Sequence, residues 1–334
     1  MDVSIVFVNY KTEALLLDCL RSIHENTPDL HFECIVVDNF YIPGQNQAIL
    51  SAYPQTTWID SGGNVGFSKA NNIGLNAASG EYVLFLNADT LVFDAAITKA
   101  YQKLKTDSSL VAVGGIQVDS NQDPIPYYRT LNAVRRDFYI VPNRPVFHQL
   151  IDRLLPEERF SRPEETNNLV GAFLMASKEN LLKLHGWDED FFMYAEDAEL
   201  SYRLSKIGKL AYFDEVKFIH LIQDNPFRRT TYSWVNRFAM QIQVSNLLWI
   251  RKSYGILPFL VIYANYTFLA PVFWAWKICL NLLKGKSILD DTNNQRIFSQ
   301  KLGILYRYFF PILFLRKGPY RIKTEENIDQ VNKS

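Results

Sequence analysis

Short apolar runs and amphipathic segments alternate along the first third of the chain. The runs are rich in β-branched residues, as buried parallel strands are, and they cover residues 3–8, 33–37, 56–59, 82–86 and 110–113. Between them, apolar residues recur at helical spacing, most clearly after Thr12 and over residues 67–78. The alternation predicts an α/β fold of Rossmann-like type, with a mostly parallel sheet and helices on both faces.

Polar residues follow three of the predicted strands. They are Asn9 with Tyr10, Asp38 with Asn39, and the stretch from Asn87 to Asp89. Ligands of parallel α/β sheets bind at the carboxyl ends of the strands. Asn and Asp are also common in turns, so it is the coincidence of three clusters that indicates a site.

The regular pattern weakens over residues 119–166, which are rich in Pro, Arg and Tyr and predict a long excursion. It resumes at residues 169–176. Helices are expected at residues 178–184 and 195–207, and a strand at residues 216–219 runs into His220.

Asp89 directly follows a buried strand, where its carboxylate can face a divalent cation and a diphosphate. Mg²⁺ and Mn²⁺ prefer oxygen ligands and are often held by one or two carboxylates plus phosphates. A turn or helix-capping aspartate explains the position equally well. His220, at a strand end, becomes a metal ligand only if the fold brings it near Asp89.

Two further stretches fit a nucleotide. Glycines at positions 62, 63 and 66 precede a helix, whose N-terminus favours phosphate, although a plain turn is the simpler interpretation. The Asp38 carboxylate can accept the N3–H of uracil or thymine.

Glu196 and Asp197 open a predicted helix after an aromatic run. Carboxylates in a first turn are favoured by the helix dipole alone. The functional interpretation is a general base beside an apolar wall, which would raise its pKa. Trp187 and Tyr194 are candidates for stacking on a sugar.

Composition narrows the class of protein. Apolar residues make up 48% of the chain, which predicts a packed core, and the formal net charge of zero argues against a nucleic-acid partner. The cysteines Cys19, Cys34 and Cys279 have no CxxC spacing, and the N-terminus lacks the features of a secretory signal. A cytoplasmic location is therefore expected.

Six stretches, taken in order, resemble the inverting family 2 glycosyltransferases of GT-A fold, in particular the bacterial rhamnosyltransferase-like branch. They are residues 6–11 (VFVNYK), 35–39 (IVVDN), 63–74 (GNVGFSKANNIG), 82–90 (YVLFLNADT), 171–175 (GAFLM) and 186–200 (GWDEDFFMYAEDAEL), with Arg203 following. Together they cover roughly residues 3–220.

The resemblance implies a role for each matching residue. Nucleotide or donor contacts would come from Asn9, Asp38, Asn64, Gly66, Phe67, Asn71 and Asn87. Asp89 and His220 would bind Mg²⁺ or Mn²⁺, although the sequence after His220 departs from the family pattern. Asp197 would be the catalytic base, with Trp187, Asp188 and Glu196 near the acceptor.

The resemblance also implies a reaction. A sugar, such as rhamnose, would pass from a nucleoside-diphosphate sugar to a hydroxyl of a glycan or lipid-linked acceptor, with inversion, in the synthesis of surface polysaccharide. Uridine-diphosphate hexoses remain open as donors.

The last third of the chain changes character. No charged residue occurs between Ser253 and Trp276, and aromatic residues with flanking Arg and Lys return at residues 306–317. The run is long enough to span a membrane, but its prolines favour helices lying in the interface. We therefore expect a catalytic domain over residues 1–225 and a helical region over 226–334, peripheral on the inner face of the cytoplasmic membrane. Packing on the core or in a homodimer is the alternative.

The sequence disfavours two other functions. A nucleotidyltransferase would carry a Gly-rich phosphate loop after the first strand, and residues 9–12 lack the glycines. A non-catalytic subunit of a polysaccharide assembly complex would be indicated by loss of Asp89 or Asp197, and both are present.

Overall fold

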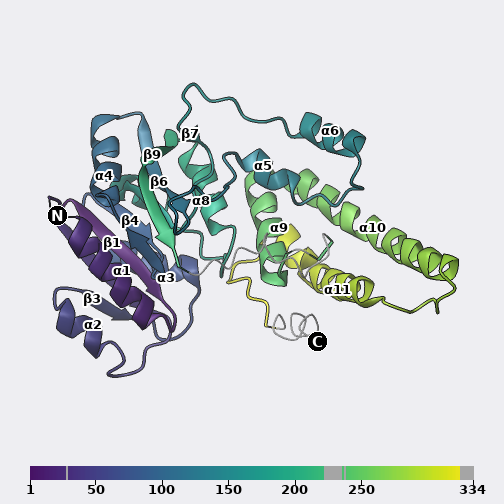
Figure 1. The fold of residues 1–334 in the computed structure, drawn as a ribbon, viewed down its shortest axis with the longest axis horizontal. Helices are drawn as coiled ribbons and strands as arrows, with labels where there is room; N and C mark the ends of the chain where they lie inside the picture. Colours follow the sequence, from purple (N-terminus) through teal and green to yellow (C-terminus); the bar gives the residue numbers. More distant parts are fainter. Residues whose placement is uncertain (28, 222–234, 237, 324–334) are drawn as a thin grey trace. The chain divides into compact units, whose positions relative to one another are not determined.

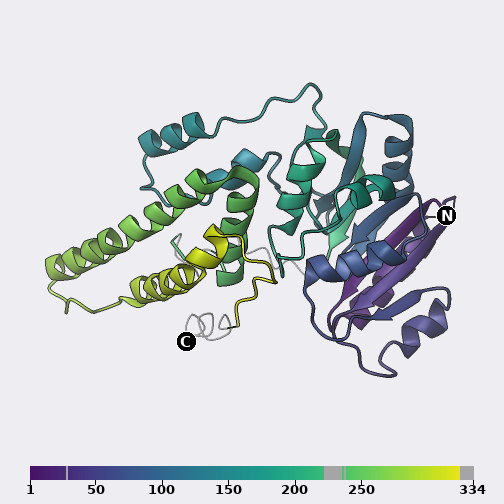
Figure 2. The ribbon, with the colours of Figure 1, turned by 180° about the vertical axis from the view of Figure 1, so that it is seen from behind.

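The computed structural model describes all residues except 28, 222–234, 237 and 324–334. The chain divides into two compact units (Figures 1 and 2). The first comprises Met1–Leu131 and Glu158–Gln223, and the second Asn132–Glu157 and Asp224–Ser334. The excursion expected at residues 119–166 thus contributes its central part to the second unit.

The first unit is built on one mixed sheet in the order β3-β2-β1-β4-β8-β6-β9-β5, with β7 beside β9. Its strands are β1 (Val3–Asn9), β2 (Phe32–Asp38), β3 (Thr57–Asp60), β4 (Tyr82–Leu86), β5 (Thr90–Val92), β6 (Leu110–Val118), β7 (Glu165–Thr166), β8 (Phe173–Ser177) and β9 (Lys209–His220).

The strand directions confirm the predicted α/β fold and refine it. Strands β3, β2, β1 and β4 are parallel, as the alternating pattern predicts. Beyond β4 the sheet becomes mixed, because β8 runs antiparallel to both β4 and β6. The short strands β5 and β7 are not among the predicted strands. Strand β9 begins at Lys209, seven residues before its predicted start at residue 216.

Helices cover both faces of this sheet (Figure 1). One face packs on α1 (Glu13–Asn26), α2 (Gln47–Ala52) and α4 (Ala96–Thr106). The other packs on α3 (Phe67–Ala77), α7 (Lys178–Lys183) and α8 (Glu196–Leu204). Strand β1 pairs with β2 on one side and with β4 on the other. The carboxyl ends of β1 and β4 therefore flank a topological switch point, where α/β sheets bind ligands.

The second unit is helical. It contains α5 (Leu131–Arg136, whose first residue belongs to the first unit), α6 (Pro145–Leu154), α9 (Met240–Tyr254), α10 (Ile256–Leu283) and α11 (Asn293–Leu313). Side-chain hydrogen bonds fasten α10 to its neighbours: the Tyr263 hydroxyl donates to the Leu305 carbonyl, and the Tyr266 hydroxyl to the Phe138 carbonyl, each at 2.7 Å.

Candidate active site

Asn9 and Asp38 lie side by side at the carboxyl ends of β1 and β2. The Asn9 amide nitrogen donates to Asp38 Oδ1 at 3.0 Å and to Glu13 at 2.9 Å, while its oxygen accepts from Thr12. Asn9 is fully buried, so it orients Asp38 rather than presenting its own amide to a ligand. Burial raises the pKa of Asp38, opposed by hydrogen bonds from the Phe40 N–H and Asn9.

Exposed aromatic residues follow these two strand ends: Tyr10, which belongs to a strand-end cluster seen in the sequence, and Phe40, which the sequence pattern did not single out. The Tyr10 and Phe40 rings meet edge to face with centroids 5.7 Å apart, and the Lys11 ammonium lies 4.1 Å from the Phe40 ring centre. Each ring is about two-fifths exposed. Their position beside Asp38, directly after the predicted Asn9 and Asp38, offers a flat face to a nucleobase.

The glycine loop before α3 is held by Asn39, which had no assigned role. Its amide donates to the Gly66 carbonyl at 3.2 Å and lies 3.5 Å from the Asn64 side-chain oxygen. Gly66 has φ +92°, and a Cβ there would lie 2.6 Å from the Phe192 carbonyl oxygen. The next residue, Phe67, donates its N–H to the same carbonyl. Only glycine allows this close approach.

Asn71 lies one turn into α3. Its side chain donates to the Phe67 carbonyl of its own helix at 3.1 Å, and the residue is almost fully buried. The structure therefore places it in support of the loop, one turn behind it.

Asn87, Asp89 and His220 come together although His220 is far away in the sequence. Antiparallel pairing of β5 with β9 sets Thr90 opposite His220. The imidazole Nε2 then lies 3.0 Å from Asp89 Oδ1 and 3.5 Å from the Asn87 amide. The Asp89 and His220 side chains are each 19% exposed, so both remain accessible to a ligand.

This donor set fits a divalent cation in part. A carboxylate and an imidazole converge: the carboxylate suits Mg²⁺ or Mn²⁺, whereas the imidazole nitrogen suits a transition metal such as Mn²⁺ better than Mg²⁺. Among the described residues no group of three His, Cys, Asp or Glu could hold a metal. The remaining ligands would therefore have to be diphosphate oxygens or water, which is usual for Mg²⁺.

The Asp197 carboxylate is held at the start of α8. Its Oδ2 accepts from the Gly171 N–H at 3.2 Å, and its Oδ1 from the Ala198 N–H at 2.8 Å. A Cβ on Gly171 would lie 3.4 Å from both the Asp197 Cβ and the Trp187 ring. These are ordinary van der Waals distances, so the segment before β8 lies directly against Asp197 and Trp187.

Burial raises the pKa of Asp197 above the usual aspartate value, opposed by these backbone N–H donors. Burial and the charge of Asp197 raise the pKa of Glu196 well above its ordinary value. Glu196 is 7% exposed, and its Oε2 has no partner among the described residues. Of the two adjacent carboxyls, Asp197 is the one whose charged form is stabilised by the Gly171 and Ala198 N–H donors.

The backbone before α8 is strained. Tyr194 and Ala195 have φ of +70° and +62°, a region that costs non-glycine residues of order 1–3 kcal/mol each and that clusters at functional sites. The strain follows from turning the aromatic run directly into the helix that begins at Glu196.

The Trp187 ring lies in the core, with 1% of the residue exposed. It packs edge to face on Phe67 and Phe85, at centroid distances of 5.6 and 5.0 Å. Its backbone exchanges two 2.8 Å hydrogen bonds with the Asn72 side chain. The expected stacking of Trp187 on an acceptor sugar is therefore not available in this arrangement, because no ring face is open. Asp188 is partly exposed and accepts from the Asp190 N–H.

Comparisons with known proteins bear on the family and the fold of the chain. Residues 4–179, more than half of the 334-residue chain, match the model of glycosyl transferase family 2. A rhamnosyltransferase, WbbL of Escherichia coli strain K12, is 26% identical over 65% of this chain and 83% of its own.

Two further relatives are similar. The low-salt glycan biosynthesis hexosyltransferase Agl10 of Haloferax volcanii is 28% identical over 60% of this chain and 61% of its own. An N-acetylglucosaminyl-diphospho-decaprenol L-rhamnosyltransferase of Mycobacterium tuberculosis is 25% identical over 56% of this chain. The match spans 65% of that relative, so it and Agl10 are each matched over less than two thirds of their length.

Among solved structures, the fold resembles the mannosyltransferase PcManGT from Pyrobaculum calidifontis in complex with GDP-Man and Mn²⁺. The TM-score is 0.50 at 17% identity, covering 94% of this chain and 88% of that one.

Fold and family match together define a sugar-transferring enzyme built on an α/β sheet. The chain belongs to glycosyl transferase family 2.

Proposed function

We propose that the protein is a metal-dependent, inverting glycosyltransferase that moves a sugar from a nucleoside-diphosphate sugar to a hydroxyl of a glycan or lipid-linked acceptor. The observation that carries this proposal is the Asp197 carboxylate, anchored by the Gly171 and Ala198 amides with a pKa raised by burial. An ionised carboxylate whose pKa is raised is a better proton acceptor than an ordinary aspartate.

In the proposed reaction, Asp197 takes the proton of the acceptor hydroxyl. The acceptor oxygen attacks the anomeric carbon from the face opposite the diphosphate. The bond between that carbon and the diphosphate oxygen breaks, and the nucleoside diphosphate leaves with the electron pair. Burial and the Asp197 charge raise the pKa of Glu196, which disfavours a second negative charge beside Asp197.

The donor's nucleotide would lie over the carboxyl ends of β1 and β2. Asp38 would accept the imide proton of the base, with Asn9 holding the carboxylate in place. Tyr10 and Phe40 would pack against the base. Asn64, Gly66 and Phe67 would line the loop over the sugar-diphosphate.

Asp89 and His220, with Asn87 beside them, would hold the Mg²⁺ or Mn²⁺. Such an ion neutralises the charge that grows on the leaving diphosphate. The PcManGT complex, which contains Mn²⁺ and GDP-Man, supports this part of the proposal. The rhamnosyltransferase relatives make thymidine-diphosphate-rhamnose the first donor to test, followed by uridine-diphosphate hexoses.

We further propose that the second unit lies on the inner face of the cytoplasmic membrane, where a lipid-linked acceptor would be found. One helix, α10, is long and apolar enough to cross a membrane, with 22% of its apolar window buried. Its exposed apolar residues include Val261, Phe268, Val272 and Trp276, and the last three recur every four residues on one helical face.

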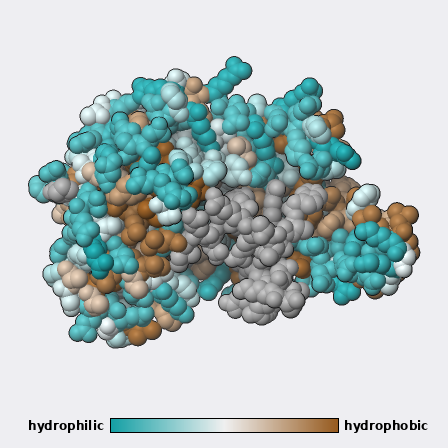
Figure 3. Space-filling view, in the orientation of Figure 1, coloured by the Kyte–Doolittle hydropathy of each residue, from teal (hydrophilic) through white to brown (hydrophobic). Residues whose placement is uncertain are grey.

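Helix α6 strengthens the membrane proposal independently. None of its residues is buried, and Val146, Leu150 and Leu154 form a stripe of 66, 52 and 70% exposure. Apolar residues of the second unit gather on the surface over α6 and the outer part of α10 (Figure 3). Lys277 and Lys284 near the end of α10 suit anionic lipid, whereas Lys286 pairs with Asp291 at 2.9 Å.

Replacing the proposed base tests the reaction. Asp197→Asn should retain binding of the donor, measured as thermal stabilisation by the nucleotide sugar with Mn²⁺, and should lose transfer by a factor of ~10² or more. Near-normal turnover by this variant would remove Asp197 from the mechanism. No response of the wild-type protein to any donor would favour a non-catalytic role.

A further inference from the structure

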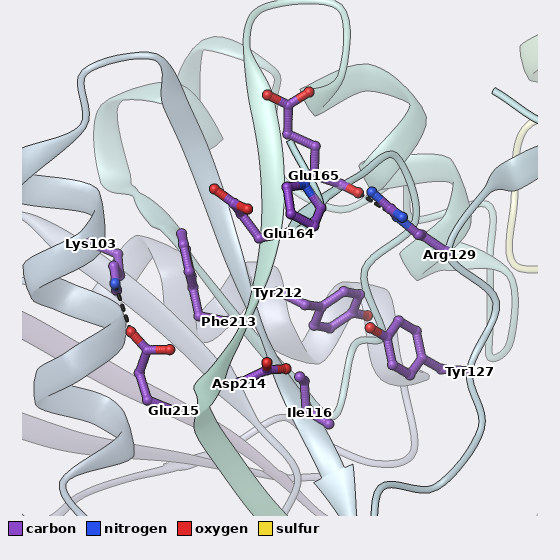
Figure 4. A pocket seen from close by; sticks show the side chains of 11 residues that line it. Lys103, Ile116, Tyr127, Arg129, Glu164, Glu165, Tyr212, Phe213, Asp214 and Glu215 are labelled. Atoms are coloured by element: carbon purple, nitrogen blue, oxygen red, sulfur yellow. Dashed lines mark hydrogen bonds and ion pairs between the residues drawn. The ribbon is translucent and has the colours of Figure 1, made fainter. Parts of the chain in front are cut away.

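A pocket of about 410 Å³ opens on the first unit beside β9 (Figure 4). On the edge that faces away from β6, strand β9 pairs with β7 up to Ala211 and with β5 from Phe218 onward. The pocket is lined by the intervening stretch of β9, from Tyr212 to Glu215. Its volume lies within the usual range for small-molecule sites.

A bulge in β9 shapes this pocket. Tyr212 pairs with Gly114, and the next pairing joins Lys217 to Ile116, so β9 carries extra residues at this point. A Cβ on Gly114 would lie 2.4 Å from the Tyr212 ring. Glycine therefore allows this ring to lie against β6, and Tyr127 packs on it with centroids 4.6 Å apart at 53°.

Some polar side chains of the pocket have hydrogen-bond or ion-pair partners among the described residues, and others do not. Lys103 pairs with Glu215 at 2.6 Å, and the Arg129 guanidinium donates to the Glu165 carbonyl at 2.8 Å. By contrast, no described residue donates a hydrogen bond to, or forms an ion pair with, the carboxylates of Glu164 and Asp214. Figure 4 shows Asp214 beside the paired tyrosine rings.

The pocket wall is connected to Asp197. The Tyr212 hydroxyl accepts the Val170 N–H at 2.9 Å, and the next amide, that of Gly171, donates to Asp197 at 3.2 Å. The charge of Asp197 contributes to the raised pKa of Tyr212, after burial. Consecutive amides thus hold the pocket wall and the proposed base in a fixed relation.

We propose that this pocket binds one neutral sugar residue of the acceptor glycan, away from the hydroxyl that reacts. A pyranose ring presents a face of C–H groups, which suits the exposed Tyr127 ring, and a rim of hydroxyls. The Tyr212 ring is 5% exposed and packs against Tyr127, so it fixes that ring rather than contacting the sugar. Carboxylates only accept hydrogen bonds, so Glu164 and Asp214 can take two of those hydroxyl protons. This assignment rests on the proposed glycosyltransferase function.

The charges of the pocket argue against other ligands. Four carboxylates and two cations line it, which disfavours a phosphate or a carboxylate ligand. A bound cation is disfavoured as well, because the described residues include no group of three His, Cys, Asp or Glu able to hold a metal.

Ligand-detected NMR on the full-length protein tests the assignment without relying on turnover. Saturation-transfer signals would be recorded for methyl α-L-rhamnoside, methyl β-D-glucoside and methyl β-N-acetylglucosaminide. Thymidine diphosphate would be added to fill the donor site, in a buffer that contains Mg²⁺ and no Mn²⁺. At least one glycoside should bind, and Tyr127→Ala and Asp214→Asn should each reduce its signal at least fivefold. Tyr306→Ala, which replaces a tyrosine of similar exposure on the second unit, should retain it.

Three results would overturn the subsite: no signal from any of the three glycosides, signals that survive both pocket variants, or displacement by CaCl₂, which would indicate a cation site. Glycoside binding in a protein that transfers no sugar would count against the proposed function and leave the pocket assignment standing.

Discussion

The His220 imidazole lies 3.0 Å from the Asp89 carboxylate across 131 positions of sequence. The contact exists because β5 turns back antiparallel to β9 directly after Asp89. Asp89 also accepts the Leu221 N–H through its backbone carbonyl. The residues after His220 that depart from the family pattern therefore do not prevent the strand from delivering the imidazole to the aspartate.

His220→Asn should weaken Mn²⁺ binding in the presence of nucleoside diphosphate by ~10–100-fold, the usual cost of removing a group that supports a metal site. Calorimetric titration with Mn²⁺ measures this directly. The control is His31→Asn, because the His31 side chain is 92% exposed. Equal Mn²⁺ affinity of the two variants would exclude His220 from the metal site.

Gly66→Ala should lower stability more than Gly62→Ala, by about 1–3 kcal/mol, the usual cost of overpacking. Both glycines have positive φ, so both substitutions strain the backbone, but only at Gly66 would the new methyl meet another group, the Phe192 carbonyl. Urea unfolding monitored by tryptophan fluorescence gives the difference. Equal unfolding midpoints for the two variants would show that the added methyl group at Gly66 does not destabilise the loop.

Glu196→Gln should stabilise the protein at neutral pH relative to wild type. The pKa of Glu196 is raised above the ordinary value of 4.5 in the folded state, so the folded protein binds the proton more tightly than the unfolded chain. Wild-type stability then falls as pH rises from about 4.5 through the raised folded-state pKa. The gain from the substitution should grow over the same window, and thermal unfolding from pH 4 to 8 will measure it. A gain that is constant with pH would contradict the raised pKa.

The rate of transfer should fall on the acid side with an apparent pKa above that of an ordinary aspartate, because protonation of Asp197 removes the base and burial raises its pKa. The dependence of kcat/KM on pH reports this value for the free enzyme. An acid limb at or below the ordinary value of 3.8 would point to a different base.

Substituting Phe268 and Trp276 with serine should reduce flotation with anionic liposomes severalfold, because these side chains are 73 and 65% exposed on one face of α10. The matched control replaces Leu182 and Ile207, exposed apolar residues of the first unit, with serine. Loss of flotation in both double variants, or in neither, would contradict a membrane surface on the second unit.

Much of the first unit follows from the sequence because its signals are local. The apolar runs at β1, β2 and β4 and the helical spacing of α1 and α3 reflect burial of each element against its neighbours. Strand-end polar residues such as Asn9, Asp38 and Asp89 could be identified for the same reason, since parallel strands end at one edge. The domain boundary at residue 225 stays a prediction, because it falls outside the described residues.

What tertiary structure decided is which distant groups meet. Nothing in the pattern around Tyr212 distinguishes it from any strand tyrosine, and its link to Asp197 depends on the amides of Val170 and Gly171. The burial of Trp187 depends likewise on Phe67 and Phe85. Sequence periodicity reports which face of an element is apolar, but contacts between elements depend on strand order and register, which no local pattern encodes.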